Sequence, residues 1–189
     1  GRTVKPMREG IASVIVGTDG SLHVVVWDPS MTIGPDVAAI RQNLPPLVKD
    51  GHSMARPGDG RAKWGLANSG LPHANRTAIG ERADGMLVFG YAHETTADVL
   101  AHAMVQAGVQ TAAVLDMNKS WPTGFTYDAP AKPGAAPKGH RIQSGIQRDP
   151  STYLHPFKKD FFVALARDVP RPASQPEQVP LGATPSPST

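Results

Sequence analysis

The sequence predicts an α+β fold, in which a mixed or antiparallel sheet is packed by helices. Asp-Gly dipeptides at 19–20 and 84–85 lie between short runs rich in β-branched and apolar residues, which is a strong hairpin signal. Each hairpin precedes a segment with apolar residues at helical spacing and then a short apolar run. We therefore expect two hairpin–helix–strand units in this chain.

The first unit is expected to occupy roughly the first quarter of the chain. Its strands are predicted at 11–17 and 22–27. A helix is predicted over 34–44, because Pro lies near its start and apolar residues recur on one face. The Pro pair at 45–46 would end this helix, and 47–48 would form a short strand.

The second unit has the same predicted order, with a hairpin over 77–89. Thr95 followed by Asp98 forms a capping-box pattern, and Gly108 marks the expected end of the helix. A short buried strand is predicted over 111–115. Equivalent turns of the two units lie about 65 residues apart, which indicates either a duplicated unit or chance recurrence of a common motif.

The remaining segments are predicted from their composition. Residues 52–75 resemble a long loop, in which Trp64 either packs against the domain or lines a site. Residues 129–140 form a Pro- and Gly-rich loop, and 161–166 are predicted as a final core strand. One domain is expected over 1–168, followed by a Pro-rich disordered tail over 169–189.

Composition excludes several classes of protein and site. The chain has 189 residues, a net charge of +3 and no run of Lys and Arg, so no nucleic-acid partner is predicted. It has no Cys, which rules out disulfides and thiolate metal sites. No apolar stretch approaches the roughly 20 residues of a membrane span.

Polar residues follow the predicted strand over 111–115. Asp116, Asn118 and Trp121 lie where α/β proteins often place their sites. Each has a structural alternative, because Asp116 and Asn118 could stabilise a turn and Trp121 could belong to the core. Asp19 and Asp84 are expected to serve only their turns.

Three segments carry a resemblance to a known family. They are Arg76-Thr77-Ala78-Ile79-Gly80, Asp84-Gly85 and Leu115-Asp116, and together they resemble the phosphodiester glycosidase family. The Leu-Asp-x-Asn pattern with a nearby Trp resembles a bacterial branch of it, as do the segments at 41–44, 153–156 and 160–162. The resemblance runs from about residue 7 to about residue 167.

The resemblance implies a hydrolase that cleaves a sugar-1-phosphodiester at the anomeric carbon. Asp116 and Arg76 are the implied catalytic residues, with Asp116 as base or oxocarbenium stabiliser. Arg76 and Arg41 are candidates for an anion clamp, because a guanidinium binds phosphate bidentately. Either arginine could instead have a purely structural role, Arg76 in an ion pair and Arg41 at the end of its helix. The remaining candidates for substrate binding are Asn43, Asn118 and Trp121.

Cofactors and partners follow from the same resemblance. No metal site is predicted, although Asp116 and the asparagines have the hard oxygen atoms that divalent cations prefer. Family members carry an upstream Asn-Gly-Gly-Phe-like segment that this sequence lacks, so a processed chain and an upstream fragment of the same precursor as partner are expected. The expected location is secreted or in the cell envelope. The alternative functions are a non-catalytic glycan- or envelope-binding protein and a subunit of a larger extracellular assembly.

Overall fold

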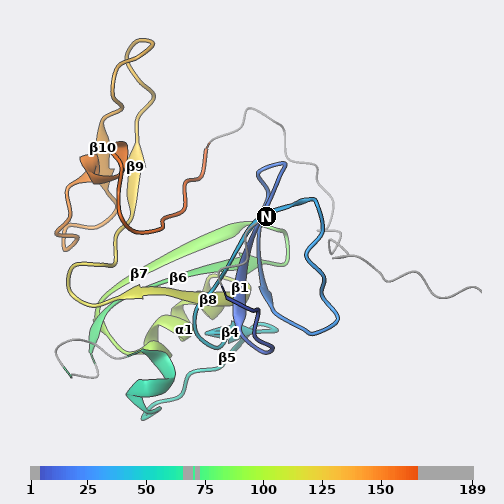
Figure 1. Ribbon diagram of the computed structural model, residues 1–189. Coiled ribbons are helices and arrows are strands. Elements are labelled where there is room, and N and C mark those ends of the chain that lie inside the picture. The colour runs from blue at the N-terminus through green and yellow to red at the C-terminus, as the bar shows by residue number, and fades with distance from the viewer. Residues whose placement is uncertain (1–4, 66–69, 71–72, 166–189) are drawn as a thin grey trace, which may run out of the picture.

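The computed structural model describes residues 5–65, 70 and 73–165 of the chain, and all strand pairs among them are antiparallel. A five-stranded sheet has the order β5-β4-β8-β6-β7, a three-stranded sheet has the order β2-β1-β3, and β9 pairs with β10 (Figure 1). The elements are β1 (Ala12–Gly17), β2 (Leu22–Val26), β3 (Val37–Gln42), β4 (Val48–Lys49), β5 (His52–Ser53), the 3-10 helix η1 (Arg61–Trp64), β6 (Ala74–Arg82), β7 (Leu87–Thr95), α1 (Ala97–Gln106), β8 (Val109–Met117), β9 (Phe125–Tyr127), β10 (Gly139–Arg141) and the 3-10 helix η2 (Pro150–Leu154).

Both Asp-Gly turns form as predicted. Gly20 and Gly85 have φ angles of 78° and 75°, which a residue with a side chain rarely adopts. The carboxylates of Asp19 and Asp84 accept hydrogen bonds from the backbone two residues later, at 2.8 and 3.0 Å. The two turns therefore set the β1–β2 and β6–β7 hairpins.

The helix predicted over 34–44 is wrong, because the segment forms strand β3 and pairs with β1. Val37 and Ile40 fit helical spacing, but both are β-branched and fit a strand equally well. Pairing with the free edge of β1 satisfies the backbone of both strands, and this tertiary contribution outweighs a short periodic pattern. The first unit is thus a three-stranded sheet, so the two similar hairpin–helix–strand units that the sequence predicted are not observed.

The five-stranded sheet lies between two layers. On one face, Leu100 and Met104 of α1 pack with Ala78, Val114 and η1 residue Trp64 in one core. On the other face, Ile79 and Ala113 pack against β1 and β2 in a second core. Burying each large apolar side chain stabilises the fold by about 1.5–3 kcal/mol, so packing on both faces holds β6 and β8 in place.

The first helical turn differs from the predicted capping box. Thr95 ends β7, and the N-cap of α1 is Thr96, whose side chain makes no capping hydrogen bond. Gly108 follows the helix with a φ of 82°, in agreement with its predicted role as the end signal. In the described part of the chain, no helix is both long and apolar enough to span a bilayer.

The segment after β8 forms a separate hairpin that projects from the two sheets (Figure 1). Aromatic side chains after β8 contact one another, and the ring centroids of Tyr153 and Phe161 lie 4.7 Å apart. The core strand predicted over 161–166 is wrong for its described residues, because 161–165 are irregular and exposed, and Leu165 is 81% exposed. The apolar residues of this segment predicted a strand, but no described strand lies beside it to form a pair. Ala166 and the predicted tail lie outside the described residues.

Candidate active site

The end of β8 is irregular where the candidate residues begin. Arg76 of β6 faces Met117, but Ala78 faces Val114, so β8 has one extra residue in this stretch. The Thr77 hydroxyl donates a 2.8 Å hydrogen bond to the carbonyl of Asp116. The Asn43 amide donates to the carbonyls of Val114 and Leu115 at 3.1 and 3.2 Å. Two side chains thus hold the bulged backbone in place.

Asp116 is exposed and lies in a cluster of charged side chains. Its pKa is raised, first by partial desolvation of the carboxylate and then by the negative charge of Asp160. Arg41, Lys159 and Arg148 each oppose this shift. Arg41 Nε forms a 2.6 Å ion pair with Asp160 Oδ2. A carboxylate that holds its proton more strongly than usual therefore lies beside three cationic groups.

Trp121 lies next to the same cations. Its ring is 5.4 Å from the Arg148 guanidinium and 5.3 Å from Lys159 Nζ, and the residue is 36% exposed. Arg148 also lies 5.1 Å from the Phe157 ring, and its Nη2 donates to the Ser120 carbonyl at 3.4 Å. Contacts with two aromatic rings and with the Ser120 carbonyl restrict the position of this guanidinium.

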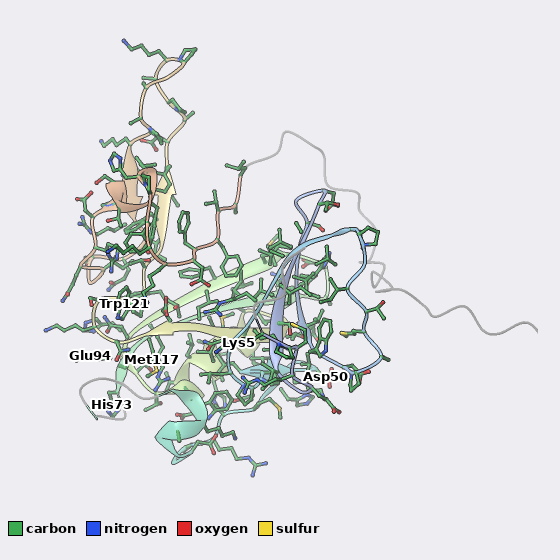
Figure 2. All side chains as sticks on the ribbon, viewed as in Figure 1. Lys5, Asp50, His73, Glu94, Met117 and Trp121 are labelled. Carbon is green, nitrogen blue, oxygen red and sulfur yellow. The ribbon has the colours of Figure 1, made fainter. Side chains whose placement is uncertain are left out.

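The structure brings Asp116, Arg41 and Trp121 to one side of the sheet. Arg41 faces Val14 across the β1–β3 pair, and Val14 belongs to the core on the β1 side. Figure 2 shows Trp121 and Met117 at the same end of the five-stranded sheet. Asp116 and Trp121 therefore share the cationic neighbours Arg148 and Lys159.

Arg76 lies on the opposite face of the sheet. Its Nη1 donates to the carbonyl of Trp64 at 2.8 Å, and its Nε donates to the carbonyl of Thr95 at 3.2 Å. Trp64 belongs to the core on the α1 side. Arg76 and Asp116 are therefore predicted partners that the structure does not bring together, and the catalytic role of each stays a prediction.

The two predicted asparagines have backbone roles. Asn43 holds the β8 bulge through its amide, as described above. Asn118 has a φ of 97°, and its N–H donates to the carbonyl of buried Asn75 at 3.1 Å. Asn75 also accepts from the N–H of Glu94 at 3.1 Å and donates to the carbonyl of Lys119 at 3.3 Å. Asn75, which was not predicted from the sequence, thus fixes the turn that leads to Trp121.

Three further residues of the charged cluster were not predicted as site residues. Asp160 forms an ion pair with Arg41 that depends on the three-dimensional fold. Arg148 and Lys159 belong to an irregular segment without any repeating pattern, so no sequence signal distinguished them from ordinary surface charges. Within the described residues, no group of three or more His, Asp or Glu side chains is arranged to hold a metal ion.

Comparison with protein families gives one match. Residues 1–116, more than half of the chain, match the model of the phosphodiester glycosidase family. The matched range ends at Asp116 and includes Arg41 and Arg76. A search of curated proteins finds no match to this chain.

Proposed function

Because the chain belongs to the phosphodiester glycosidase family and is therefore a glycosidase-type hydrolase, we propose that it cleaves a sugar-1-phosphodiester at Asp116. The observation that carries this proposal is the raised pKa of Asp116 in a cluster with three cations and a part-exposed indole. This combination matches what the reaction requires. A carboxylate acts at the anomeric carbon, cations bind the phosphate, and an aromatic ring contacts the sugar.

In the proposed reaction, water attacks the anomeric carbon. The bond between that carbon and the bridging oxygen breaks, and the phosphate leaves as a monoester with the bridging oxygen attached. A phosphate is a better leaving group than a sugar alkoxide, so the demand for a general acid is small. Asp116 either accepts the proton of the attacking water or stabilises the positive charge that develops on the sugar ring.

Arg41, with Arg148 and Lys159, is proposed to bind the phosphate. The ion pair with Asp160 involves Nε of Arg41, and the Arg41 side chain is 59% exposed, so a ligand can reach its guanidinium. Charge-assisted hydrogen bonds of this kind are the strong ones in phosphate recognition. Trp121 is proposed to stack on the sugar, which would require Arg148 or Lys159 to turn from its ring towards the phosphate.

Asn43 and Asn118 are proposed to act on the substrate indirectly. Because the Asn43 amide is bound to the backbone of β8, its contribution is to fix the position of Asp116. Asn118 shapes the turn between Asp116 and Trp121, and its positive φ sets the direction of that turn.

The proposal extends to the setting of the reaction. The expected substrates are phosphodiester-linked sugars of a cell envelope or an extracellular glycan, and the enzyme would be secreted or located in that envelope. An upstream segment of the same precursor, of the Asn-Gly-Gly-Phe-like kind expected for the family, is proposed to complete the site. Both parts rest on the family resemblance and need their own tests, which are cell fractionation and an assay with the added segment.

The test is hydrolysis of UDP-N-acetylglucosamine and a panel of sugar-1-phosphodiesters, with and without the upstream segment. Asp116→Asn should lower kcat by about 100-fold or more, because it replaces the carboxylate with a neutral amide that cannot act as a base. Asp128→Asn is the matched control, since Asp128 is an exposed aspartate in the separate hairpin. Binding of these ligands without turnover under any condition would instead favour a glycan-binding protein.

A further inference from the structure

An irregular segment after η2 contributes two side chains to the charged cluster at the end of β8. This segment covers residues 157–165 and is called the strap below. Asp160 Oδ2 lies 2.6 Å from Arg41 Nε, and Lys159 Nζ lies 5.3 Å from the centre of the Trp121 ring. Two adjacent residues of the strap therefore contact the two groups to which phosphate and sugar recognition are assigned above.

The Asp160 carboxylate resembles the anionic part of the proposed substrate. A carboxylate and a phosphodiester each carry one negative charge on two terminal oxygens, and a guanidinium binds both. Asp160 is also near enough to Asp116 for its charge to raise the pKa of that residue, whereas Lys159 lowers it. The strap therefore places a substrate-like anion beside the carboxylate that is proposed to act on the substrate.

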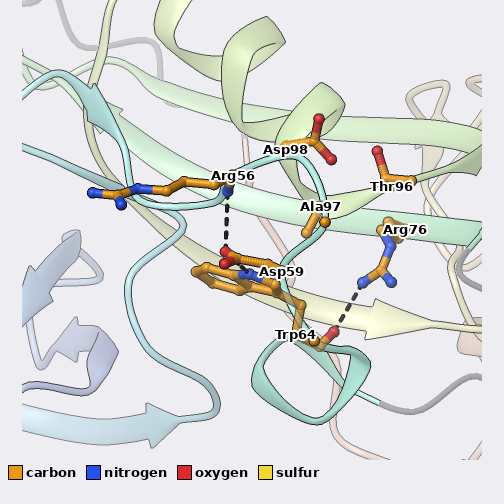
Figure 3. A pocket seen from close by; sticks show the side chains of 9 residues that line it. Arg56, Asp59, Trp64, Arg76, Thr96, Ala97 and Asp98 are labelled. Carbon is orange, nitrogen blue, oxygen red and sulfur yellow. Dashed lines mark hydrogen bonds between the residues drawn. The ribbon is translucent and has the colours of Figure 1, made fainter.

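The other arginines are less able than Arg41 to receive a ligand. Arg76 lies on the opposite face of the sheet, where its Nη1 donates to the Trp64 carbonyl at 2.8 Å (Figure 3). Arg148 is restricted by two aromatic rings and by the Ser120 carbonyl, as described above. Occupation of the exposed Arg41 guanidinium by the strap thus has a direct effect on phosphate binding.

The strap is held mainly by its side chains. Among the described residues, it makes no backbone-to-backbone hydrogen bond with any other segment. The rings of Phe157 and Phe161 lie 5.2 and 4.7 Å from that of Tyr153, and Leu165 is exposed. Both side chains of the ion pair are exposed, and such a pair contributes little to stability. A ligand can therefore displace Asp160 without unfolding a strand or a helix.

We propose that Asp160 is an internal competitor of the substrate, which occupies Arg41 until a phosphodiester displaces it. The proposal rests on the proposed function, because it requires that Arg41 binds the phosphate. On binding, the Asp160 carboxylate leaves Arg41, and Lys159 turns from Trp121 towards the phosphate, which frees the indole for the sugar. A neutral glycoside provides no anion to replace Asp160, so the strap favours anionic substrates.

The test is an NMR titration of the labelled protein with dimethyl phosphate, and neutral trimethyl phosphate is the control ligand. Neither ligand has an anomeric carbon, so the result does not depend on hydrolysis. Dimethyl phosphate should shift the Arg41 Nε resonance, the Asp160 carboxyl carbon and the Trp121 indole N–H together, and trimethyl phosphate should not. A shift at Arg41 without one at Asp160 would overturn this proposal alone. No shift at Arg41 would overturn the assigned phosphate role of Arg41 as well.

Two variants separate displacement from general electrostatics, because each removes one negative charge from the same cluster. Asp160→Asn removes the competitor and should tighten dimethyl phosphate binding by about fivefold or more. Asp116 acts on Arg41 only through space, so Asp116→Asn should tighten binding less. Without ligand, the strap amides of Asp160→Asn should already be shifted towards their positions in the ligand-bound wild type. Equal tightening in the two variants, or unchanged strap resonances in Asp160→Asn, would overturn the proposal.

Discussion

The pKa of Asp116 should move in opposite directions when the two members of the Arg41–Asp160 ion pair are removed. Asp160 raises this pKa and Arg41 lowers it, and the two are joined at 2.6 Å. Asp160→Asn removes a negative charge and leaves Arg41 unpaired, so the Asp116 pKa should fall towards or below the ordinary aspartate value of 3.8. Arg41→Gln removes the positive charge and leaves Asp160 unpaired, so the Asp116 pKa should rise further.

The size of each shift follows from the exposure of the pair. The two side chains are 59% and 66% exposed, so water and salt screen their charges. At such a surface a unit charge several ångströms away contributes about 1 kcal/mol, which corresponds to roughly 0.7 pKa unit.

The assay is carbon NMR of the Asp116 carboxyl group as a function of pH, in the wild type and both variants. Raising the salt concentration should reduce both shifts, since the charges are solvent-exposed. Shifts of the same sign in the two variants, or no shift in either at low salt, would refute the described arrangement of charges.

Three other predictions follow from the structure. Gly80→Ala should lower the free energy of unfolding by about 1–3 kcal/mol in denaturant titrations, because its Cβ would collide with Val109 and approach the Thr111 carbonyl to 3.0 Å; an unchanged midpoint would contradict this packing. His23 has a pKa raised chiefly by its hydrogen bond with Glu81, so the pair stabilises the fold below the unfolded pKa of about 6.5 and this stabilisation is lost as the pH rises through the folded pKa. Unfolding measured at about pH 6 and 8 should therefore show a larger decrease in stability for the wild type than for His23→Gln, and equal decreases would exclude the pair as the cause. Trp121→Leu should raise KM about tenfold with little change in kcat if the indole only binds the sugar. An equal fall in kcat and in kcat/KM would instead require that Trp121 acts in the transition state.

The second half of the fold could be predicted from local signals. Asp84-Gly85 fixes a turn through a positive φ and a side-chain hydrogen bond, and both depend on adjacent residues only. The helix before Gly108 has a continuous apolar face, so its existence was clear, although its start differs by one residue. Trp64 packs in the core, which is one of the two roles that its sequence context allowed.

The first half depends on contacts between distant residues. The segment over 37–42 is too short for the spacing of its apolar residues to distinguish a helix from a strand, and pairing with β1 decides its structure. Towards the other end of the chain, the apolar residues over 161–165 predict a strand, but the described fold offers them no neighbouring strand.

The candidate site could be predicted only in part, because its arrangement also depends on contacts between distant residues. Asp116, Arg41 and Trp121 could be named from their motifs, but their proximity depends on the packing of the two sheets. The separation of Arg76 from Asp116 depends on one extra residue in β8, which shifts the register by one position. No pattern in the sequence marks that bulge.

The most direct test of the proposed function is hydrolysis of a sugar-1-phosphodiester in water labelled with oxygen-18. Cleavage at the anomeric carbon places the label in the sugar hydroxyl group, whereas cleavage at phosphorus places it in the phosphate. The proposed function predicts an unlabelled phosphate product by phosphorus NMR, together with turnover that Asp116→Asn suppresses. A labelled phosphate, or undiminished turnover in Asp116→Asn, would contradict it.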